Sequence, residues 1–188
     1  FRPHSKTHKC PTIAALQMDM GAVGVCAAKI SEAAIMLAAG IPSVLITSPI
    51  ATSAKARALN SLLAEYPDHQ LLMVIDSDQG LAALQNALDS ERRLGLLVDI
   101  DLSMGRTGTR EVETMLRLID AIVGDDRFEF RGIQHYAGHL MHIEDYAKRR
   151  DKSLASWARL DEFFAALEHR GIPLDIVTGG GTGTYDVD

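Results

Sequence analysis

The sequence has little of what several classes of protein require. Its two cysteines, Cys10 and Cys26, are too few for a disulfide framework and lack the spacing of a metal site. No apolar run approaches the roughly 18 residues that span a bilayer, and no signal peptide opens the chain. The net charge of −6 leaves no basic surplus for a phosphate backbone. These absences argue against membrane and nucleic-acid partners and favour a reduced, cytoplasmic protein.

The composition that remains is that of a globular domain. Hydrophobic residues make up 47% of the 188 residues and charged residues 23%, which leaves ample apolar sequence for a core. The chain begins at Phe1 rather than at methionine, and it stops at Asp188, directly after a glycine-rich segment. We therefore expect residues 1–188 to form one domain that is incomplete at both ends.

Short apolar runs alternate with longer amphipathic stretches along the whole chain. Familiar signals delimit the helices, such as Pro11 in a first turn, Gly40 after a last turn and Pro67 beyond another. The pattern predicts about seven strands, at 1–6, 23–28, 43–47, 71–75, 94–100, 128–136 and 174–177, and six helices, at 11–20, 31–39, 54–66, 80–88, 111–123 and 151–169.

Strict alternation of strands and helices indicates a parallel sheet, which either closes into a barrel or stays open. Nearly every polar cluster follows a strand, as HSKTHK, DSD, DLSMGR, HYAGH and TGGGTGT do. A barrel gathers all such loops at one mouth, whereas an open sheet spreads them along an edge. We therefore expect an α/β fold of the (β/α)8 TIM-barrel type, with about seven of its eight strands present and the eighth after Asp188.

The first polar cluster, RPHSKTHK at 2–9, contains a candidate Schiff-base lysine. Such a lysine must be held rigidly, partly desolvated and near other cations that lower its pKa. Lys6 at the end of a strand meets these requirements, and strand alternation would place His4, Lys6 and His8 on one side. The alternatives are a basic surface loop and a metal site built on His4 and His8.

A glycine-rich run, TGGGTGT at 178–184, follows the last predicted strand. Its glycines let backbone N–H groups approach an anion, and hydroxyls such as those of Thr178 and Thr182 add donors. Barrels commonly bind phosphate after the seventh strand, and the run lacks the lysine of a Walker loop. We interpret it as a phosphate site, and the alternative is a flexible tail.

Arg106 lies between two glycines after the strand at 94–100, where it could reach an anionic oxygen. Asp99 and Asp101 share one face of that strand and could orient the arginine or line the barrel. A solvent-facing turn is the alternative interpretation of this motif.

Tyr136 ends the strand at 128–136, where its ring could flank a flat cofactor. His139 and His142 follow at a spacing of three, and Asp145 extends the series to a pattern that could bind a metal. We favour one of the two histidines as a catalytic residue over a metal site on this loop.

Taken in order, RPHSKTHKCP, VCAAKISEA, VDIDLSMGRTG, IQHYAGHLMH and VTGGGTGTYD resemble the motifs of D-threonine aldolases and their D-serine dehydratase relatives. These are pyridoxal 5′-phosphate (PLP) enzymes of the alanine-racemase-like group, fold type III. The resemblance covers essentially the whole chain. The lysine motif and the glycine loop together are quite specific, whereas the GRxG motif is shared with racemases.

The resemblance assigns roles to single residues. Lys6, and not Lys9, would be the Schiff-base lysine, and His142 would act near the substrate. Arg106 would contact the side of the cofactor that carries the phenolic oxygen, and Tyr136 would lie beside the ring. The cofactor-binding set is completed by His4, Thr178, Gly180, Gly181, Thr182 and Gly183.

The resemblance also implies parts that lie outside residues 1–188. Members of the family have a C-terminal β domain that holds the ligands of a divalent metal (Mn, Mg or Zn). No metal ligand is therefore expected before Asp188. The family works as a homodimer, in which each barrel mouth faces the β domain of the partner.

The implied function is that of a PLP-dependent lyase for D-β-hydroxy amino acids, which cleaves them to glycine and an aldehyde. D-serine dehydratase (deaminase) or racemase chemistry on the same barrel is the first alternative, although no second base for a racemase is evident. A non-catalytic PLP-binding homeostasis protein is the second alternative. A barrel metallohydrolase using His4, His8 and His139 is the third.

Overall fold

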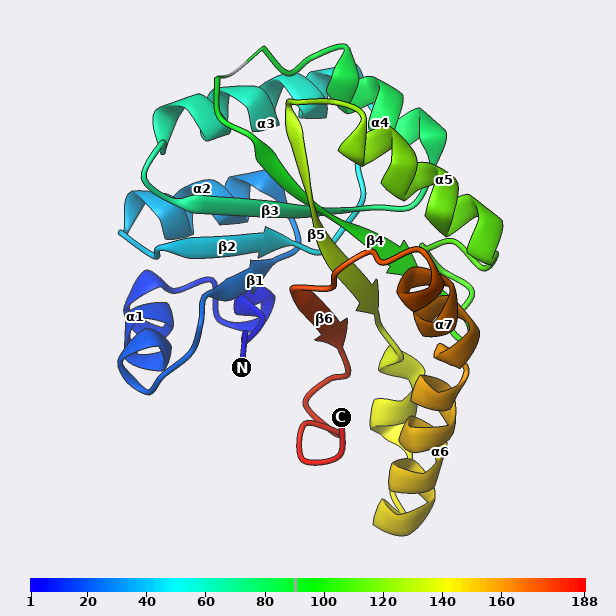
Figure 1. Ribbon diagram of the computed structural model, residues 1–188. Helices are drawn as coiled ribbons and strands as arrows, with labels where there is room; N and C mark the ends of the chain where they lie inside the picture. Colours follow the sequence, from blue (N-terminus) through cyan, green and yellow to red (C-terminus); the bar gives the residue numbers. More distant parts are fainter. Residues whose placement is uncertain (90) are drawn as a thin grey trace.

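The protein folds into a strongly curved parallel sheet with helices along its outer side (Figure 1). The computed structural model describes residues 1–89 and 91–188. The strands are β1 (Val25–Ala27), β2 (Ser43–Ile46), β3 (Gln70–Ile75), β4 (Leu94–Ile100), β5 (Phe128–His135) and β6 (Ile176–Gly179). The helices are α1 (Pro11–Asp19), α2 (Ile30–Ala38), α3 (Ser53–Glu65), α4 (Asp78–Gln85), α5 (Val112–Val123), α6 (Tyr146–Ala158) and α7 (Asp161–His169), with 3-10 turns η1 (Ser5–Thr7) and η2 (Gly138–His142).

The six strands pair in sequence order, and every pair is parallel. Because side chains alternate along a strand, each strand presents residues to both sides of the sheet. One side packs against the helices in a large core that includes Met73 and Phe128. The other side carries a smaller apolar layer made of strand residues alone: Cys26, Leu45, Leu72, Val74 and Leu97, with Ile176 packed against them.

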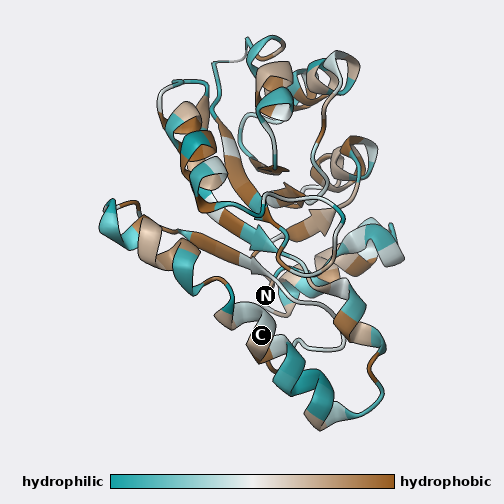
Figure 2. Cartoon of the chain, turned by 90° about the vertical axis from the view of Figure 1, so that its right-hand side faces the viewer, coloured by the Kyte–Doolittle hydropathy of each residue, from teal (hydrophilic) through white to brown (hydrophobic). Residues whose placement is uncertain are grey.

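This architecture confirms the predicted parallel α/β fold, and a curled sheet with helices outside is consistent with a TIM-type barrel wall. Figure 2 shows the hydrophobic residues concentrated in the strands and on the helix faces turned toward them. The two chain ends lie near each other on the open side of the curl in both views. None of the described helices is both long and apolar enough to span a membrane. Closure by eight strands stays a prediction.

The predicted strand at 1–6 is wrong in its second half: His4 bridges to β1 opposite Cys26, and the carbonyl of Pro3 accepts the N–H of Cys26 at 2.8 Å, but no regular strand continues beyond His4. The chain then turns into η1, where the carbonyl of Ser5 accepts the N–H groups of His8 (3.2 Å) and Lys9 (2.7 Å). The hydroxyl of Ser5 donates to the carbonyl of Cys26 at 2.9 Å. The local bonds to the carbonyl of Ser5 compete with strand pairing, so the described residues form six strands rather than seven.

The single helix predicted at 151–169 is two helices, α6 and α7. The first of them begins earlier, at Tyr146, because the side chain of Asp145 accepts the N–H of Lys148 at 2.7 Å and caps it. The break comes at Leu160, which is fully buried in the core between the two helices. Burial of this side chain turns the chain at a point where the helical period alone would continue it.

A β-bulge in β5 decides which of its side chains face the inner side of the curled sheet. The register between β4 and β5 skips Arg131. Phe130 before the bulge and Ile133 after it both pack against the helices, although strict alternation would put them on opposite faces. The bulge therefore turns Gln134 toward the interior.

Candidate active site

The carboxyl ends of the last three strands carry a row of polar side chains beside the apolar inner layer. Asp99 on β4, Gln134 on β5 and Thr178 on β6 are partners in the sheet register. Asp99 and Gln134 are buried, and Thr178 is half-buried. The loops that follow the strands bring the predicted site residues to this end of the sheet, where barrels of this kind carry their sites.

Lys6 lies in η1 with an exposed side chain. Two expectations about it are wrong. A 3-10 turn does not place His4, Lys6 and His8 on one side as a strand would, and the side chain is not desolvated. Its amine lies beside an aromatic ring, because Nζ is 5.6 Å from the ring centroid of Tyr136. An amine in this position is open to a carbonyl compound from solution.

Arg106 approaches the same ring. Its Cζ lies 4.9 Å from the ring centroid of Tyr136, within the range of a cation–π contact. The structure therefore brings together Lys6, Arg106 and Tyr136, which the sequence singled out on three separate loops. Positive charges around one aromatic ring suit a flat anionic ligand.

Lys9, the other lysine of the motif, forms an ion pair with a residue of α2. Its Nζ pairs with Glu32 Oε1 at 3.3 Å, and Glu32 Oε2 accepts the N–H of Ala28 at 2.9 Å. Burial raises the pKa of Glu32, but these two partners outweigh burial and lower that pKa. The ion pair ties the lysine loop to α2 and leaves Lys6 as the amine that faces Tyr136.

His4 connects the lysine loop to the residue after β2. Its Nδ1 accepts the N–H of Lys6 at 3.2 Å. The proton of the neutral ring is therefore assigned to Nε2, which bonds Thr47 Oγ1 at 3.1 Å. Burial, followed by the charge of Lys6, lowers the pKa of His4 to about 4. The ring is thus neutral at pH 7, where it holds the turn without adding charge to the site.

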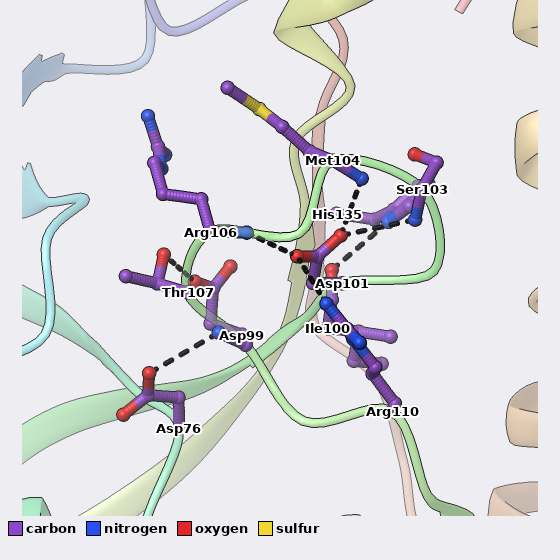
Figure 3. A network of polar contacts seen from close by, with 11 residues as sticks. Asp76, Asp99, Ile100, Asp101, Ser103, Met104, Arg106, Thr107, Arg110 and His135 are labelled. Carbon is purple, nitrogen blue, oxygen red and sulfur yellow. Dashed lines mark hydrogen bonds and ion pairs between the residues drawn. The ribbon is translucent and has the colours of Figure 1, made fainter.

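The loop after β4 is built around Asp101 (Figure 3). The carboxylate of Asp101 accepts the backbone N–H groups of Ser103, Met104 and Arg106 at 3.0, 2.7 and 2.7 Å. Burial raises the pKa of Asp101, and these N–H groups outweigh burial and lower it. Asp101 thus fixes the main chain of Arg106, while the Arg106 side chain points away from that carboxylate.

Asp99 lies deeper and belongs to a second polar cluster. Gln134 Nε2 donates to Asp99 Oδ1 at 2.8 Å, and Thr107 Oγ1 donates to Asp99 Oδ2 at 2.9 Å. Gln134 Nε2 also lies 3.5 Å from the carbonyl oxygen of Thr47. Sequence reasoning missed Gln134 and Thr47. The available signal for Gln134 was a polar residue inside an apolar strand, but its inward direction depends on the bulge.

The glycine-rich run forms a turn after β6. This strand ends at Gly179, two residues later than predicted, so Thr178 is a strand residue. Gly180 has a φ of +64°, and a Cβ there would collide with the carboxylate of Asp188. The hydroxyl of Thr184 donates to that same carboxylate. The run is therefore a hydrogen-bonded turn rather than a flexible tail.

This turn packs against η2, which carries His142. The N–H of Gly183 contacts Met141 Sδ at 3.1 Å, and the carbonyl of Gly183 accepts Arg149 Nε at 2.7 Å. His142 itself is exposed, and so is Thr182 of the turn. Within residues 1–89 and 91–188, no hydrogen bond or ion pair joins His142 or residues 180–183 to Lys6. The two groups share one end of the sheet without direct contact.

The family model for the alanine racemase N-terminal domain matches residues 2–185 of this chain. The chain belongs to the alanine racemase N-terminal domain family. One curated relative is a 3-hydroxy-D-aspartate aldolase of Paracoccus denitrificans (strain Pd 1222), 34% identical over 98% of this chain and 48% of its own. Another is a D-threonine aldolase of an Arthrobacter species, 31% identical over 100% of this chain and 49% of its own.

The crystal structure of D-threonine aldolase from Filomicrobium marinum superposes on this alanine racemase N-terminal domain with a TM-score of 0.93 and 34% sequence identity. The match covers 100% of this chain and 50% of that chain. The chain thus spans about half the length of the relatives it matches. These findings confirm the family resemblance inferred from the five motifs.

A metal site made of His4, His8 and His139 is not assembled in this domain. Across the described residues, no three histidine, cysteine, aspartate or glutamate side chains group as a metal site. His8 Nδ1 accepts the N–H of Cys10 at 3.0 Å, and His139 is exposed on η2. The metallohydrolase interpretation is therefore wrong for these residues.

Proposed function

We propose that this chain is the cofactor-binding domain of a PLP-dependent lyase that cleaves D-β-hydroxy amino acids to glycine and an aldehyde, in the manner of a D-threonine aldolase. The observation that carries the proposal is the placement of Lys6 and Arg106 around the ring of Tyr136. The aldolase names of the two curated relatives support the reaction class.

The residues at this end of the sheet fit the chemical groups of PLP. Lys6 offers an exposed amine for the aldehyde, Tyr136 an aromatic face for the ring, and Arg106 a guanidinium for the phenolic oxygen. The turn at 180–183 would supply backbone N–H groups for the phosphate, apart from that of Gly183, which contacts Met141 Sδ, and Thr178 and Thr182 would add hydroxyl donors. Bound PLP would supply an electron sink for the bond broken at Cα of the substrate.

Two groups of the protein hold this arrangement before any ligand arrives. His4 accepts the N–H of Lys6 and fixes the lysine turn against Thr47. Asp101 accepts the N–H of Arg106 and fixes the arginine turn. Because both turns are already ordered, less conformational freedom is lost when the cofactor binds.

A divalent metal (Mn, Mg or Zn) and a homodimer complete the proposal. The metal ligands would lie outside residues 1–188, and the metal would contribute Lewis acidity at the substrate hydroxyl. The same barrel residues would also serve a D-serine dehydratase or a racemase. The products formed by the full-length protein therefore decide between these chemistries.

His142 is the candidate base for the β-hydroxyl proton. We expect His142→Ala to retain PLP binding and to lower kcat roughly 10²- to 10⁴-fold, as loss of a general base does. The measurement is steady-state kinetics with D-threonine alongside a PLP titration. His139→Ala is the matched control, because His139 is also exposed on η2, and it should keep its turnover. Unchanged turnover in His142→Ala would remove His142 from the mechanism.

A product assay on the full-length protein tests the proposed reaction. D-Threonine should yield glycine and acetaldehyde in the presence of PLP and a divalent metal. Pyruvate and ammonia from D-serine alone would indicate a dehydratase, and interconversion of alanine enantiomers would indicate a racemase. PLP binding without any turnover would indicate the homeostasis protein. A protein that takes up no PLP would overturn the proposal.

A further inference from the structure

Asp99 is a buried carboxyl that the proposed reaction does not use. It lies on the inner side of β4, 2% exposed, at the level of Gln134 on the neighbouring strand. Both of its oxygens accept hydrogen bonds, one from Gln134 Nε2 and one from Thr107 Oγ1. Two residues earlier on the same strand, Leu97 belongs to the apolar inner layer. Alternation along β4 thus places the Asp99 carboxyl on the same face as this apolar layer.

Several elements place polar or charged groups around Asp99. Burial is the largest influence and raises the pKa of Asp99 to about 7. The charge of Asp76, after β3, raises this pKa further, whereas the bonds to Gln134 and Thr107 and the charge of Arg106 lower it. The network continues from Gln134 to Thr47 after β2, and from there to His4 and Lys6 in η1.

A carboxyl of this kind lowers the stability of the folded protein at neutral and higher pH. There the fold must hold a buried charge that the unfolded chain keeps in water. A buried carboxyl that destabilises the fold when it is ionised points to a role other than folding.

We propose that Asp99 is a positioning residue for Arg106 and, through Arg106, for the ring of the bound cofactor. The inference rests on the proposed function, in which Arg106 and Tyr136 flank that ring. Ionised Asp99 accepts the hydroxyl of Thr107, the residue next to Arg106, and its negative charge interacts favourably with the charge of Arg106. Asp101 fixes the main chain of the same turn, and Figure 3 shows both carboxylates bonded to it.

Protonation of Asp99 changes this arrangement. An ionised carboxylate accepts hydrogen bonds only, whereas a protonated one must donate one. The hydroxyl of Thr107 can reverse its bond by rotation, but the amide nitrogen of Gln134 cannot accept. Proton uptake therefore reverses the bond to Thr107 and removes the negative charge that interacts with Arg106. The turn holds Arg106 more firmly when Asp99 is ionised.

The test measures the affinity of the full-length protein for PLP as a function of pH. The absorbance of the lysine-bound cofactor is the signal. Asp99→Asn keeps an acceptor for Gln134 but cannot ionise. We expect the wild type to bind PLP about tenfold more tightly than the variant at pH ~8 and no more than about twofold more tightly at pH ~6. The lysine amine must be unprotonated in both proteins, so this shared requirement cancels in the ratio of affinities.

Two further measurements separate this role from a structural one. Asp120→Asn removes an exposed carboxyl of α5 that pairs with Arg170, and it should follow the wild type at every pH. In thermal unfolding without PLP, wild-type stability should fall as pH rises from about 4 to about 7, because the pKa of Asp99 is higher in the folded state. Asp99→Asn lacks this fall, so its Tm relative to the wild type should rise with pH.

The outcomes are distinct for the two proposals. If the wild type binds PLP but the affinity ratio to Asp99→Asn is constant between about pH 6 and about pH 8, the Asp99 inference is overturned and the proposed function stands. If the wild type binds no PLP, the proposed function is overturned and the Asp99 inference with it.

Discussion

Replacing Lys6 by alanine should abolish the yellow absorbance of the lysine-bound cofactor and lower turnover at least about a hundredfold. The expected loss is chemical rather than structural, because the Lys6 side chain is exposed and sits in a turn held by Ser5 and His4. We therefore expect a change in unfolding free energy of no more than about 0.5 kcal/mol. The measurement is an absorbance spectrum after loading with PLP and dialysis against PLP-free buffer, then borohydride trapping and mass mapping of the modified peptide.

Lys9→Ala is the matched control for this prediction. Lys9 has the same chemistry and lies three residues along the same motif, but its amine pairs with Glu32. Lys9→Ala should keep the absorbance and lose only the ion pair between the lysine loop and α2. Colour that survives dialysis in Lys6→Ala, or a borohydride adduct on Lys9, would contradict the assignment of Lys6.

The fold was predictable where the sequence signal is local. Apolar strands at 43–47, 71–75 and 94–100 appear as β2, β3 and β4 with small shifts at their ends. The errors arose where a single side chain redirects the backbone. Ser5 binds the carbonyl of Cys26 and closes a turn in place of a strand. Leu160 is buried in the core and divides one predicted helix into two.

The candidate site, too, was predictable from sequence only in part. Lys6, Arg106 and Tyr136 could be singled out because each stands in a short motif, after a strand for Arg106 and Tyr136 and after the bridge of His4 to β1 for Lys6. Their meeting around one ring follows from the parallel order of the strands. The bonds that Gln134 makes to Asp99 and to the carbonyl of Thr47 could not be predicted from sequence, because they join residues far apart in the chain. They also depend on the bulge in β5, which turns Gln134 inward.

Gly132 lies at this bulge in β5. The position of β6, and of the glycine turn that follows it, depends on the absence of a side chain at Gly132. Gly132 has a φ of +141°, and a Cβ there would collide with the carbonyl of Ile176 on β6. Gly132→Ala must therefore displace β6, which carries Thr178 and leads into the turn at 180–183. Backbone strain and the collision together should lower the unfolding free energy by about 3 kcal/mol or more. Chemical denaturation measures this change.

Gly21→Ala separates the two causes. Gly21 also has a positive φ, +95°, but a Cβ there would meet no atom within 4 Å. Its substitution should cost only the backbone strain, about 1 kcal/mol, and leave PLP affinity unchanged. Gly132→Ala should weaken PLP binding as well, because the phosphate turn moves with β6. Equal losses of stability in the two variants would mean that β5 and β6 tolerate a side chain between them. In that case the close packing of β6 on β5 would not be what places the phosphate turn.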